Sequence, residues 1–391
     1  MSPRPDDPGP VPPELRGHVP ALDGLRGLAV LLVLIFHIAQ SEPAPAVGIA
    51  RAICQATRLG QTGVDLFFVL SGFLITGILH DTKASPRYFL NFYGRRTLRI
   101  FPLYYGVLIA AYVLMPAFFG VRPLGVDPIW LWTYTANLPT TFGVDGGTFG
   151  HFWTLAIEEQ FYLVWPAVVY SLGRKRLMAV CLGCIAGAAG VRLAMEHRGL
   201  TSFTFTLARM DSLTLGAWLA LAARGPAGMI GWRGKARVVA IATAALAAPL
   251  YLARSGSGAA WLQVFKYLPI AIFYGAILVL AVTSRPSSRA GRPFRSAILR
   301  WLGKYSYGLY VFHPIFIVLA GRITAGSSDP RWASAARVGM IVAGSLAAAW
   351  LSWHLYEKHF LAWKTLFVDT TPIPASAPSR SRRPARGVVA P

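Results

Sequence analysis

The stretch LDGLRGLAVLLVLIFHIAQ, residues 22–40, decides the fold class of this chain. It is apolar and long enough to cross a bilayer as a helix, which takes about 20 residues. Arg26 and His37 interrupt the apolar run eleven positions apart. At about 100° per residue, eleven steps return within about 20° of the starting direction and advance about 16 Å along the axis. The two side chains therefore share one helix face, and Asp23 lies within about 40° of it.

The whole chain of 391 residues has the composition of a membrane protein. Hydrophobic residues make up 54% of it, charged residues only 14%, and the mean hydropathy is +0.48. A soluble protein carries about 25% charged residues. The net charge of +22 is also found in nucleic-acid-binding chains. Such chains are not this apolar, so the composition excludes a nucleic-acid partner and predicts a polytopic protein of the lipid bilayer.

Apolar segments recur along the sequence at the length of a membrane span. A window of about 19 residues finds ten of them, and a shorter re-entrant or interfacial piece at 129–138. If the N-terminus is cytosolic and the spans alternate, 27 of the 38 basic residues fall on the cytosolic side, as the positive-inside rule requires. The ten segments are 22–40, 60–79, 100–119, 151–172, 177–195, 208–223, 236–252, 262–283, 299–320 and 335–356.

The sequence therefore predicts an all-α, polytopic membrane helix bundle of about ten transmembrane helices, with both termini cytosolic. We expect a disordered cytosolic segment at 1–20, a transmembrane domain at 21–360 and a cytosolic Pro/Ser/Arg-rich tail at 361–391. A cleaved signal peptide is the alternative for the first segment. Three ionisable residues inside its apolar run argue against cleavage, which would also invert the charge pattern.

Ionisable side chains inside the spans are the candidates for function, because each costs about 2.5–3.5 kcal/mol to insert and usually faces a cavity. Asp65 precedes the apolar run FFVLSGFL, and we expect it to pair with Arg26 or His37. Within that run, Ser71 and Gly72 are small enough to permit close contact with another helix.

Arginines gather at one cytosolic membrane edge, in the stretch FYGRRTLRIFP, residues 92–102. A positive-inside anchor explains Arg95. The regular Arg96-x-x-Arg99 before Pro102 favours a phosphate site instead, because guanidinium groups bind phosphate with several charge-assisted hydrogen bonds.

Two later spans carry further polar residues. The stretch HFWTLAIEEQFY, residues 151–162, places Glu158 and Glu159 about 100° apart on a helix, so only one is expected to share the polar cavity. The stretch GKYSYGLYVFHP, residues 303–314, contains His313, and the last span ends at Glu357.

Other patterns in the sequence are weaker. Cys181 and Cys184 form a C-x-x-C without further metal ligands nearby, so we expect packing residues and no metal site. His18 and Asp23 have a spacing used by glycerolipid acyltransferases, but His18 lies in the proline-rich start of the chain. The chain has no G-x-S-x-G nucleophile elbow of a hydrolase.

In order and spacing, these motifs resemble the acyltransferase 3 family of membrane O-acyltransferases, which includes bacterial lipopolysaccharide O-acetyltransferases and macrolide O-acyltransferases. The resemblance covers roughly residues 20–360. It rests on LDGLRGLA with Arg26 and His37, on Asp65 before FFVLSGFL, on Arg96-x-x-Arg99-x-x-Pro102, on FWTLAIEEQFYL and on YSYGLYVFH.

The resemblance implies a multi-pass enzyme of the bacterial plasma membrane. Its reaction would move an acyl group, commonly acetyl from acetyl-CoA, to a hydroxyl of a sugar on a cell-surface glycan or a glycosylated metabolite. The family pattern has an acidic residue near the end of the domain, and in this sequence it falls on Glu357. The following Lys358-His359 departs from the family pattern. Many relatives carry a fused SGNH esterase-like domain, and we expect none in this sequence because about 35 residues follow the last predicted span.

We therefore expect His37 to act as general base on the acceptor hydroxyl, with Asp23 or Asp65 orienting its ring. Acyl-CoA is a substrate, not a permanently bound cofactor; Arg26 would hold a CoA phosphate or the thioester oxygen. The predicted catalytic residues are His37, Asp23, Glu158 and Glu357, and the predicted substrate-binding residues are Arg26, Asp65, Arg96, Arg99, Trp153 and His313.

The alternative function is a proton-coupled secondary transporter, in which intramembrane acids and histidines relay protons. The sequence shows no inverted repeat and no matching pair of broken spans, and a cytosolic Arg-x-x-Arg has no obvious use in such a protein. These features favour the enzyme.

Overall fold

A computed structural model of the chain describes residue 15 and residues 17–43, 47–252 and 264–368. Within these residues the regular structure is entirely helical, which confirms the all-α class. Most of the predicted N-terminal disordered segment, at 1–14 and 16, lies outside the described residues. The same holds for the predicted cytosolic tail from residue 369 onward.

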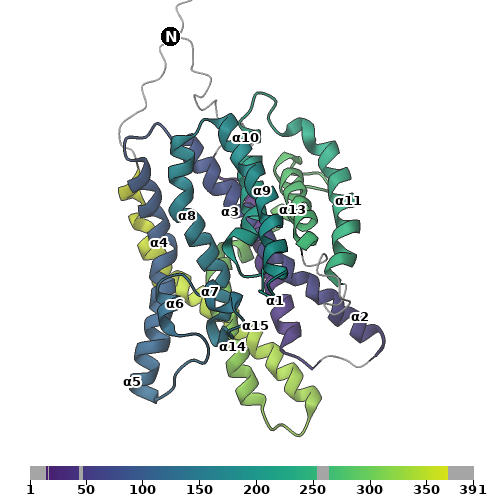
Figure 1. Ribbon diagram of the computed structural model, residues 1–391. Coiled ribbons are helices and arrows are strands. Elements are labelled where there is room, and N and C mark those ends of the chain that lie inside the picture. The colour runs from purple at the N-terminus through teal and green to yellow at the C-terminus, as the bar shows by residue number, and fades with distance from the viewer. Residues whose placement is uncertain (1–14, 16, 44–46, 253–263, 369–391) are drawn as a thin grey trace, which may run out of the picture.

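Ten long helices make up the described part of the bundle, and shorter helices and single turns connect them (Figure 1). The long helices are α1 (Pro20–Gln40), α3 (Gly63–Asp81), α4 (Tyr88–Ile109), α8 (Trp153–Ser171), α9 (Arg174–Glu196), α10 (Met210–Ala223), α11 (Arg233–Leu252), α13 (Tyr267–Thr283), α14 (Ala297–Thr324) and α15 (Pro330–Ser352). The shorter α-helices are α2 (Gly48–Thr57), α5 (Met115–Phe119), α6 (Pro128–Trp132), α7 (Asn137–Thr141) and α16 (Lys358–Ala362). The 3₁₀ turns are η2 (Arg58–Thr62), η4 (Gly147–Phe152), η5 (Thr206–Arg209), η6 (Ile230–Trp232), η7 (Pro293–Arg295) and η9 (Trp363–Phe367), and the π turns are η3 (Ala110–Leu114) and η8 (Trp353–Glu357).

Each of the ten apolar segments of the sequence coincides with one of these long helices. Seven helical stretches among the described residues are long and apolar enough to cross a membrane, and α13 is apolar but shorter. The seven are Pro20–Gln40, Gly48–Asp81, Tyr88–Phe119, Arg174–Glu196, Ile230–Leu252, Ala297–Thr324 and Pro330–Phe367. A multi-pass membrane protein is confirmed, whereas about ten spans and cytosolic termini stay predictions.

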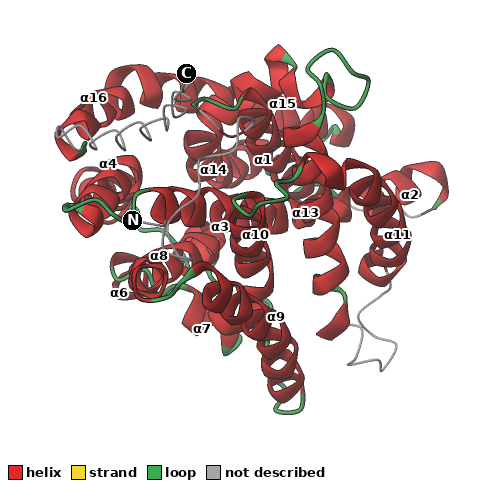
Figure 2. Cartoon of the chain, turned by 90° about the horizontal axis from the view of Figure 1, so that it is seen from above, coloured by secondary structure: helices red, strands yellow, loops and turns green. Residues whose placement is uncertain are grey.

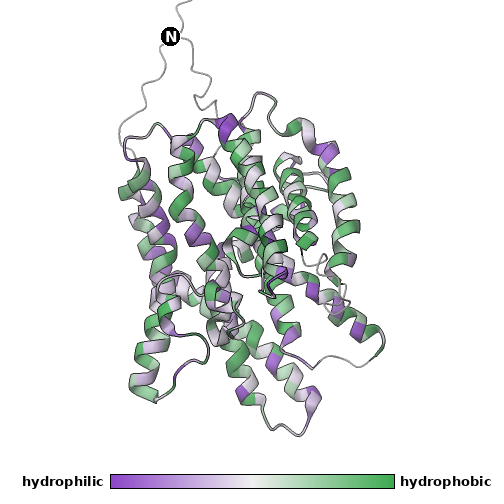
Figure 3. Cartoon of the chain, viewed as in Figure 1, coloured by the Kyte–Doolittle hydropathy of each residue, from purple (hydrophilic) through white to green (hydrophobic). Residues whose placement is uncertain are grey.

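Hydrophobic residues predominate along the helices (Figure 3), and many of the large ones are exposed on the outside of the bundle. Leu163, Ile241 and Leu355 are each exposed over more than 60% of their surface. Exposed apolar surface on this scale is expected where lipid is the solvent. Hydrophilic residues appear instead within the lengths of α4 and α8, two helices that line the interior described below (Figure 3).

The helices α1 and α14 lie against each other in the middle of the bundle (Figure 2). Their backbones approach so closely that a Cβ atom on Gly27 would lie 1.9 Å from the Leu299 carbonyl oxygen, and one on Gly303 would lie 1.9 Å from that of Asp23. Only glycine permits this approach. The two helices run in the same direction, and their glycines set the register in which they pair.

The helices α3 and α10 form a second close pair in the centre of the bundle (Figure 2). A Cβ atom on Gly72 would lie 1.8 Å from the Leu213 carbonyl oxygen, which confirms the close contact expected at this position. Arg224, just after α10, bonds to Asp81 at the end of α3 at 2.5 and 2.6 Å. The remaining long helices pack around these two pairs.

Candidate active site

A basic pocket opens at one end of the bundle, between α3, α4 and the C-terminal turn η9. Its volume is about 440 Å³, which is in the range of small-molecule sites. Four cationic side chains line it, and none of the described residues around it is acidic. The lining consists of Ile75, Ile78, Thr82, Asn91, Phe92, Arg95, Arg96, Arg99, Lys364, Thr365 and Val368.

The arginines predicted to bind phosphate are held in this pocket by α4. The helix presents Arg96 and Arg99 at i and i+3, hence on one face. The Arg96 guanidinium lies 4.0 Å above the ring of Tyr162 on α8, and that of Arg99 lies 5.8 Å from the Trp353 ring. Arg26 of α1 is close enough for its charge to act on both. Arg95, expected to be only an anchor, also lines the pocket.

A smaller cavity of about 70 Å³, the inner cavity, lies deeper in the bundle between α3, α8 and α14. Glu158 lines it and accepts a hydrogen bond from Ser71 of α3. Glu159 does not line it, as the 100° offset between neighbouring helical residues predicts. The other lining residues are Val64, Phe67, Phe68, Thr154, Leu155, Ser306, Tyr307 and Tyr310.

Tyrosines of α14 connect the inner cavity to its two neighbouring regions. The Tyr307 hydroxyl donates to the Ile100 carbonyl on α4, at 2.7 Å, next to the basic pocket. The Tyr310 hydroxyl bonds to Thr154 Oγ1 at 2.5 Å and donates to the carbonyl of His151, three residues before Thr154 in the chain. Tyr310 is buried, and its ring lies 5.0 Å from that of His151.

Histidines gather beyond Tyr310. The ring centroids of His37 and His313 are 5.0 Å apart, and those of His313 and His151 are 5.4 Å apart. His37 and His313 each lie ten residues after a glycine of the α1–α14 contact, Gly27 and Gly303. Because parallel helices keep their register, the glycine contact places the two histidines side by side.

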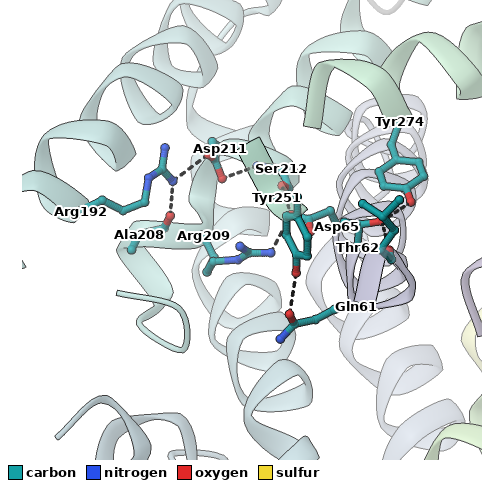
Figure 4. A network of polar contacts seen from close by, with 11 residues as sticks. Gln61, Thr62, Asp65, Arg192, Ala208, Arg209, Asp211, Ser212, Tyr251 and Tyr274 are labelled. Carbon is teal, nitrogen blue, oxygen red and sulfur yellow. Dashed lines mark hydrogen bonds and ion pairs between the residues drawn. The ribbon is translucent and has the colours of Figure 1, made fainter. Parts of the chain in front are cut away.

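Asp65 is not part of this site, and its predicted pairing with Arg26 or His37 is wrong. The structure places it in a separate buried network, in which Arg209 Nη2 bonds to Asp65 Oδ1 at 2.6 Å and Ser212 Oγ donates to it at 3.1 Å (Figure 4). In the same network, Arg192 bonds to Asp211 at 2.7 Å (Figure 4). Arg209, at the start of α10, forms the ion pair with Asp65 and neutralises its charge. Asp65 therefore forms no ion pair with Arg26.

The predicted orientation of the His37 ring by an acid is also wrong. His37 Nδ1 bonds to the Val33 carbonyl of its own helix at 2.9 Å. Asp23 lies at the other end of α1, where it bonds to His18 at 2.5 Å and lies 3.5 Å from Arg26. His18 and Asp23, the pair with the H-x4-D spacing of glycerolipid acyltransferases, therefore do contact each other. However, His18 is mostly exposed and lies about 16 Å or more along the axis from His37.

Two further predicted residues occupy different surroundings. Glu357 is buried in the π turn η8, accepts a hydrogen bond from Ser352 at 3.0 Å and lies within the electrostatic reach of Arg99. Trp153 packs between aromatic rings, 4.7 Å from Phe203 and 6.2 Å from Phe68. Glu357 thus belongs to the basic end of the site, whereas Trp153 shapes the wall beside the inner cavity.

The site therefore combines a basic pocket, a small inner cavity with Glu158 in its wall, and a pair of imidazoles. Sequence reasoning missed Lys364, Tyr310 and His151. Lys364 falls in the predicted tail, although the apolar pattern WKTLF that continues after Glu357 is a signal of further helix. Tyr310 and His151 stand within the polar motifs of their spans, but only the packing of the turn η4 against α14 shows that they meet.

Comparison with known proteins places this arrangement in a family. The acyltransferase domain family matches residues 19–354. The peptidoglycan O-acetyltransferase OatA of Listeria monocytogenes is 28% identical over 371 residues, which is 88% of this chain and 56% of that protein. The putative peptidoglycan O-acetyltransferase YrhL of Bacillus subtilis is 30% identical over 87% of this chain and 54% of its own length. The acyltransferase MdmB of Streptomyces mycarofaciens is 27% identical over 85% of this chain and 87% of its own.

No solved structure gives a significant match. The chain spans about half the length of the first two relatives and most of the length of MdmB. Since the family match covers most of the chain, and most residues of the site lie inside it, this protein belongs to the acyltransferase 3 family.

Proposed function

We propose that this protein is an O-acyltransferase of the bacterial plasma membrane that moves an acyl group, preferably acetyl, from acyl-CoA to a hydroxyl of a cell-surface glycan. Family membership and relatives named as peptidoglycan O-acetyltransferases support the reaction and the acceptor class. The observation that carries the proposal is the set of four cationic side chains in the basic pocket, together with the inner cavity lined by Glu158 and Tyr310 and the histidine rings next to Tyr310.

The donor binds in the basic pocket. Arg95, Arg96, Arg99 and Lys364 offer four positive charges to the phosphates of CoA, on the side that the charge pattern predicts to be cytosolic. The uncharged pantetheine arm then enters the bundle past Tyr162, with Arg26 beside it. Its thioester reaches the inner cavity, where Glu158, Tyr307 and Tyr310 provide the polar groups.

The acceptor hydroxyl reacts at the His37 end. His37 Nε2 takes the proton of the hydroxyl while its oxygen attacks the thioester carbonyl carbon. The carbon–sulfur bond then breaks, and the CoA thiolate receives the proton from the imidazolium. The products are the O-acyl ester and CoA thiol, so no proton is gained or lost. Tyr310 lines the inner cavity, and its ring lies 6.0 Å from that of His313. Its hydroxyl donates to the His151 carbonyl in this structure and would turn from that carbonyl to the thioester oxygen as charge develops there.

Acetyl transfer by the purified full-length chain in lipid nanodiscs tests the proposal, with radiolabelled acetyl-CoA and peptidoglycan fragments. The His37→Ala change should lower kcat by about 10²–10⁴-fold, the usual contribution of a general base. The Arg96→Ala and Arg99→Ala changes should raise KM for acetyl-CoA. His197→Ala and Arg87→Ala remove an exposed histidine and an exposed arginine outside the site and serve as matched controls.

Label in the glycan that depends on His37 supports the enzyme. Normal transfer by a well-expressed His37→Ala protein would refute the mechanism. Proton or solute flux that occurs without acetyl-CoA and without covalent transfer would support the transporter instead.

A further inference from the structure

We propose that His37 and His313 form a two-point subsite for hydroxyl groups, so that the acceptor must present two neighbouring hydroxyls, of which one is acylated and the other is held. This inference rests on the proposed function and names the feature of the acceptor that the site selects. It depends on the hydrogen-bonding state of the two imidazole rings, on their burial and on their distance.

The tautomer of His37 follows from its backbone contact. Nδ1 lies 2.9 Å from the Val33 carbonyl oxygen, which can only accept a hydrogen bond. In the neutral ring the hydrogen is therefore on Nδ1, and Nε2 carries a lone pair. No other residue in the described part of the chain bonds to this Nε2.

The tautomer of His313 follows in the same way. Its Nδ1 lies 2.9 Å from the Tyr310 carbonyl oxygen and 3.1 Å from that of Leu309. Its Nε2 therefore also presents a lone pair, and this atom is buried without a hydrogen-bond partner among the described residues. Two adjacent helices thus carry neighbouring imidazole rings whose Nε2 atoms are both acceptors, so neither ring can supply a hydrogen to the other's Nε2.

A buried acceptor without a donor is rare in proteins and destabilising, so it points to a guest that brings the donor. His313 is completely buried, whereas His37 is only partly buried. The ring centroids are 5.0 Å apart, a distance that two hydroxyls on one sugar ring can bridge. No trio of His, Cys, Asp or Glu in the described ranges is placed to hold a metal ion, so hydroxyl donors fit this pair better than a cation does.

The two histidines then have different tasks. His37 is the more exposed of the two and removes the proton from the attacking hydroxyl. His313 accepts a hydrogen bond from the second hydroxyl and fixes the ring of the acceptor, which makes it a positioning residue. An acceptor with a single hydroxyl leaves Nε2 of His313 unpaired, and a site built around a polar partner discriminates against a guest that lacks it.

The test uses the full chain in nanodiscs, acetyl-CoA and small acceptors of known structure. The probes are methyl β-glucoside and its 3-deoxy, 4-deoxy and 6-deoxy derivatives, with acetylated product measured by mass spectrometry. Transfer to peptidoglycan fragments is measured in parallel and tests the proposed function by itself. We expect removal of the correct second hydroxyl to raise KM about tenfold with little change in kcat.

The variants His313→Ala and His313→Gln complete the test. His313→Ala should raise KM for methyl β-glucoside about tenfold and remove the difference between it and the deoxy probe. His313→Gln retains an acceptor oxygen and should restore part of that difference. His197→Ala is the control, and thermal unfolding of each variant reports whether it folds.

The outcomes separate the two proposals. If transfer to peptidoglycan requires His37 but the protein acetylates all the glucosides equally, or none of them, the two-point subsite is overturned. The proposed function then remains intact. The subsite is likewise overturned if His313→Ala keeps the wild-type ratio between the diol and its deoxy form, or if it lowers kcat alone. Absence of transfer to every acceptor refutes the proposed function itself.

Discussion

Asp65 and Glu158 are both acids within apolar helices, but the structure gives them different surroundings. Asp65 bonds to Arg209 and Ser212, so its charge is neutralised inside the scaffold. Glu158 accepts from the uncharged hydroxyl of Ser71 and lines the inner cavity. The sequence identifies both as costly to bury, but it does not show which acid has a cation bonded to it, because their partners lie more than 80 positions away.

Lys364 gives a residue-scale prediction. The change Lys364→Ala removes one of four positive charges from the basic pocket and should raise KM for acetyl-CoA about threefold to tenfold, with kcat unchanged. The effect should shrink as salt is added, because salt screens the attraction. The control is Lys358→Ala, since Lys358 is exposed on the preceding helix and does not line the pocket. An equal effect of both changes would show that Lys364 acts only through the general surface charge.

The ring tautomers give a second prediction at this scale. In ¹⁵N spectra of histidine-labelled protein, His37 and His313 should both appear with the hydrogen on Nδ1, because a backbone carbonyl faces that atom in each ring. The variants His37→Ala and His313→Ala assign the signals. A hydrogen on Nε2 of either ring would contradict the hydroxyl subsite.

At the scale of elements, glycines decide which helices touch. Gly27 and Gly303 bring the backbones of α1 and α14 together, and the common register carries this contact ten residues further to the two histidines. The sequence motif around Arg26 therefore has two functions. It supplies the charge, and its glycine positions a histidine about 15 Å away along the axis.

The change Gly303→Ala tests this coupling between contact and site. The added Cβ would lie 1.9 Å from the Asp23 carbonyl oxygen, so α1 and α14 must separate. We expect a loss of about 1–3 kcal/mol of stability, typical of overpacking, and a fall in kcat as His37 and His313 move apart. Gly321→Ala on the same helix is the control, because nothing lies within 4 Å of its added Cβ. Full activity of Gly303→Ala would show that the site does not depend on this contact.

At the scale of the whole molecule, buried ion pairs connect helices that are distant in sequence. The Arg209–Asp65 and Arg192–Asp211 pairs tie α3, α9 and α10 together (Figure 4). The Arg209 guanidinium also lies 4.5 Å from the ring of Tyr267 on α13. These pairs lie outside the active site. The charged residues of these pairs, although they lie within the helix bundle, therefore have a structural role.

Removal of one partner should therefore unfold the scaffold more easily than removal of both. The change Arg209→Leu leaves Asp65 buried and unpaired, and we expect a loss of about 3–5 kcal/mol in the free energy of unfolding. The double change Arg209→Leu with Asp65→Leu should recover most of that loss, as measured by denaturation in mixed micelles. Equal destabilisation by the single and double changes would contradict this account.

The orientation of the molecule gives the last prediction. If the positive-inside rule holds, the connection between α13 and α14 is cytosolic and that between α14 and α15 faces outside. In a chain with its three native cysteines replaced by alanine, Ser327→Cys should react with an impermeant maleimide on intact cells, whereas Ser287→Cys should react only after lysis. The reverse pattern would invert the topology.

The sequence by itself determined the all-helical class, the membrane setting and the arginines of the basic pocket together with His37. These features are local, because apolar length, charge bias and residue spacing along one helix can be counted without knowledge of the neighbours. Only the tertiary structure decided that Asp65 pairs with Arg209 and that Lys364 lines the basic pocket. It also decided that the rings of His37, His313 and His151 lie next to one another. Such pairings depend on which helices pack together and in which register, and in this chain that is set by glycine contacts between segments as much as 280 positions apart.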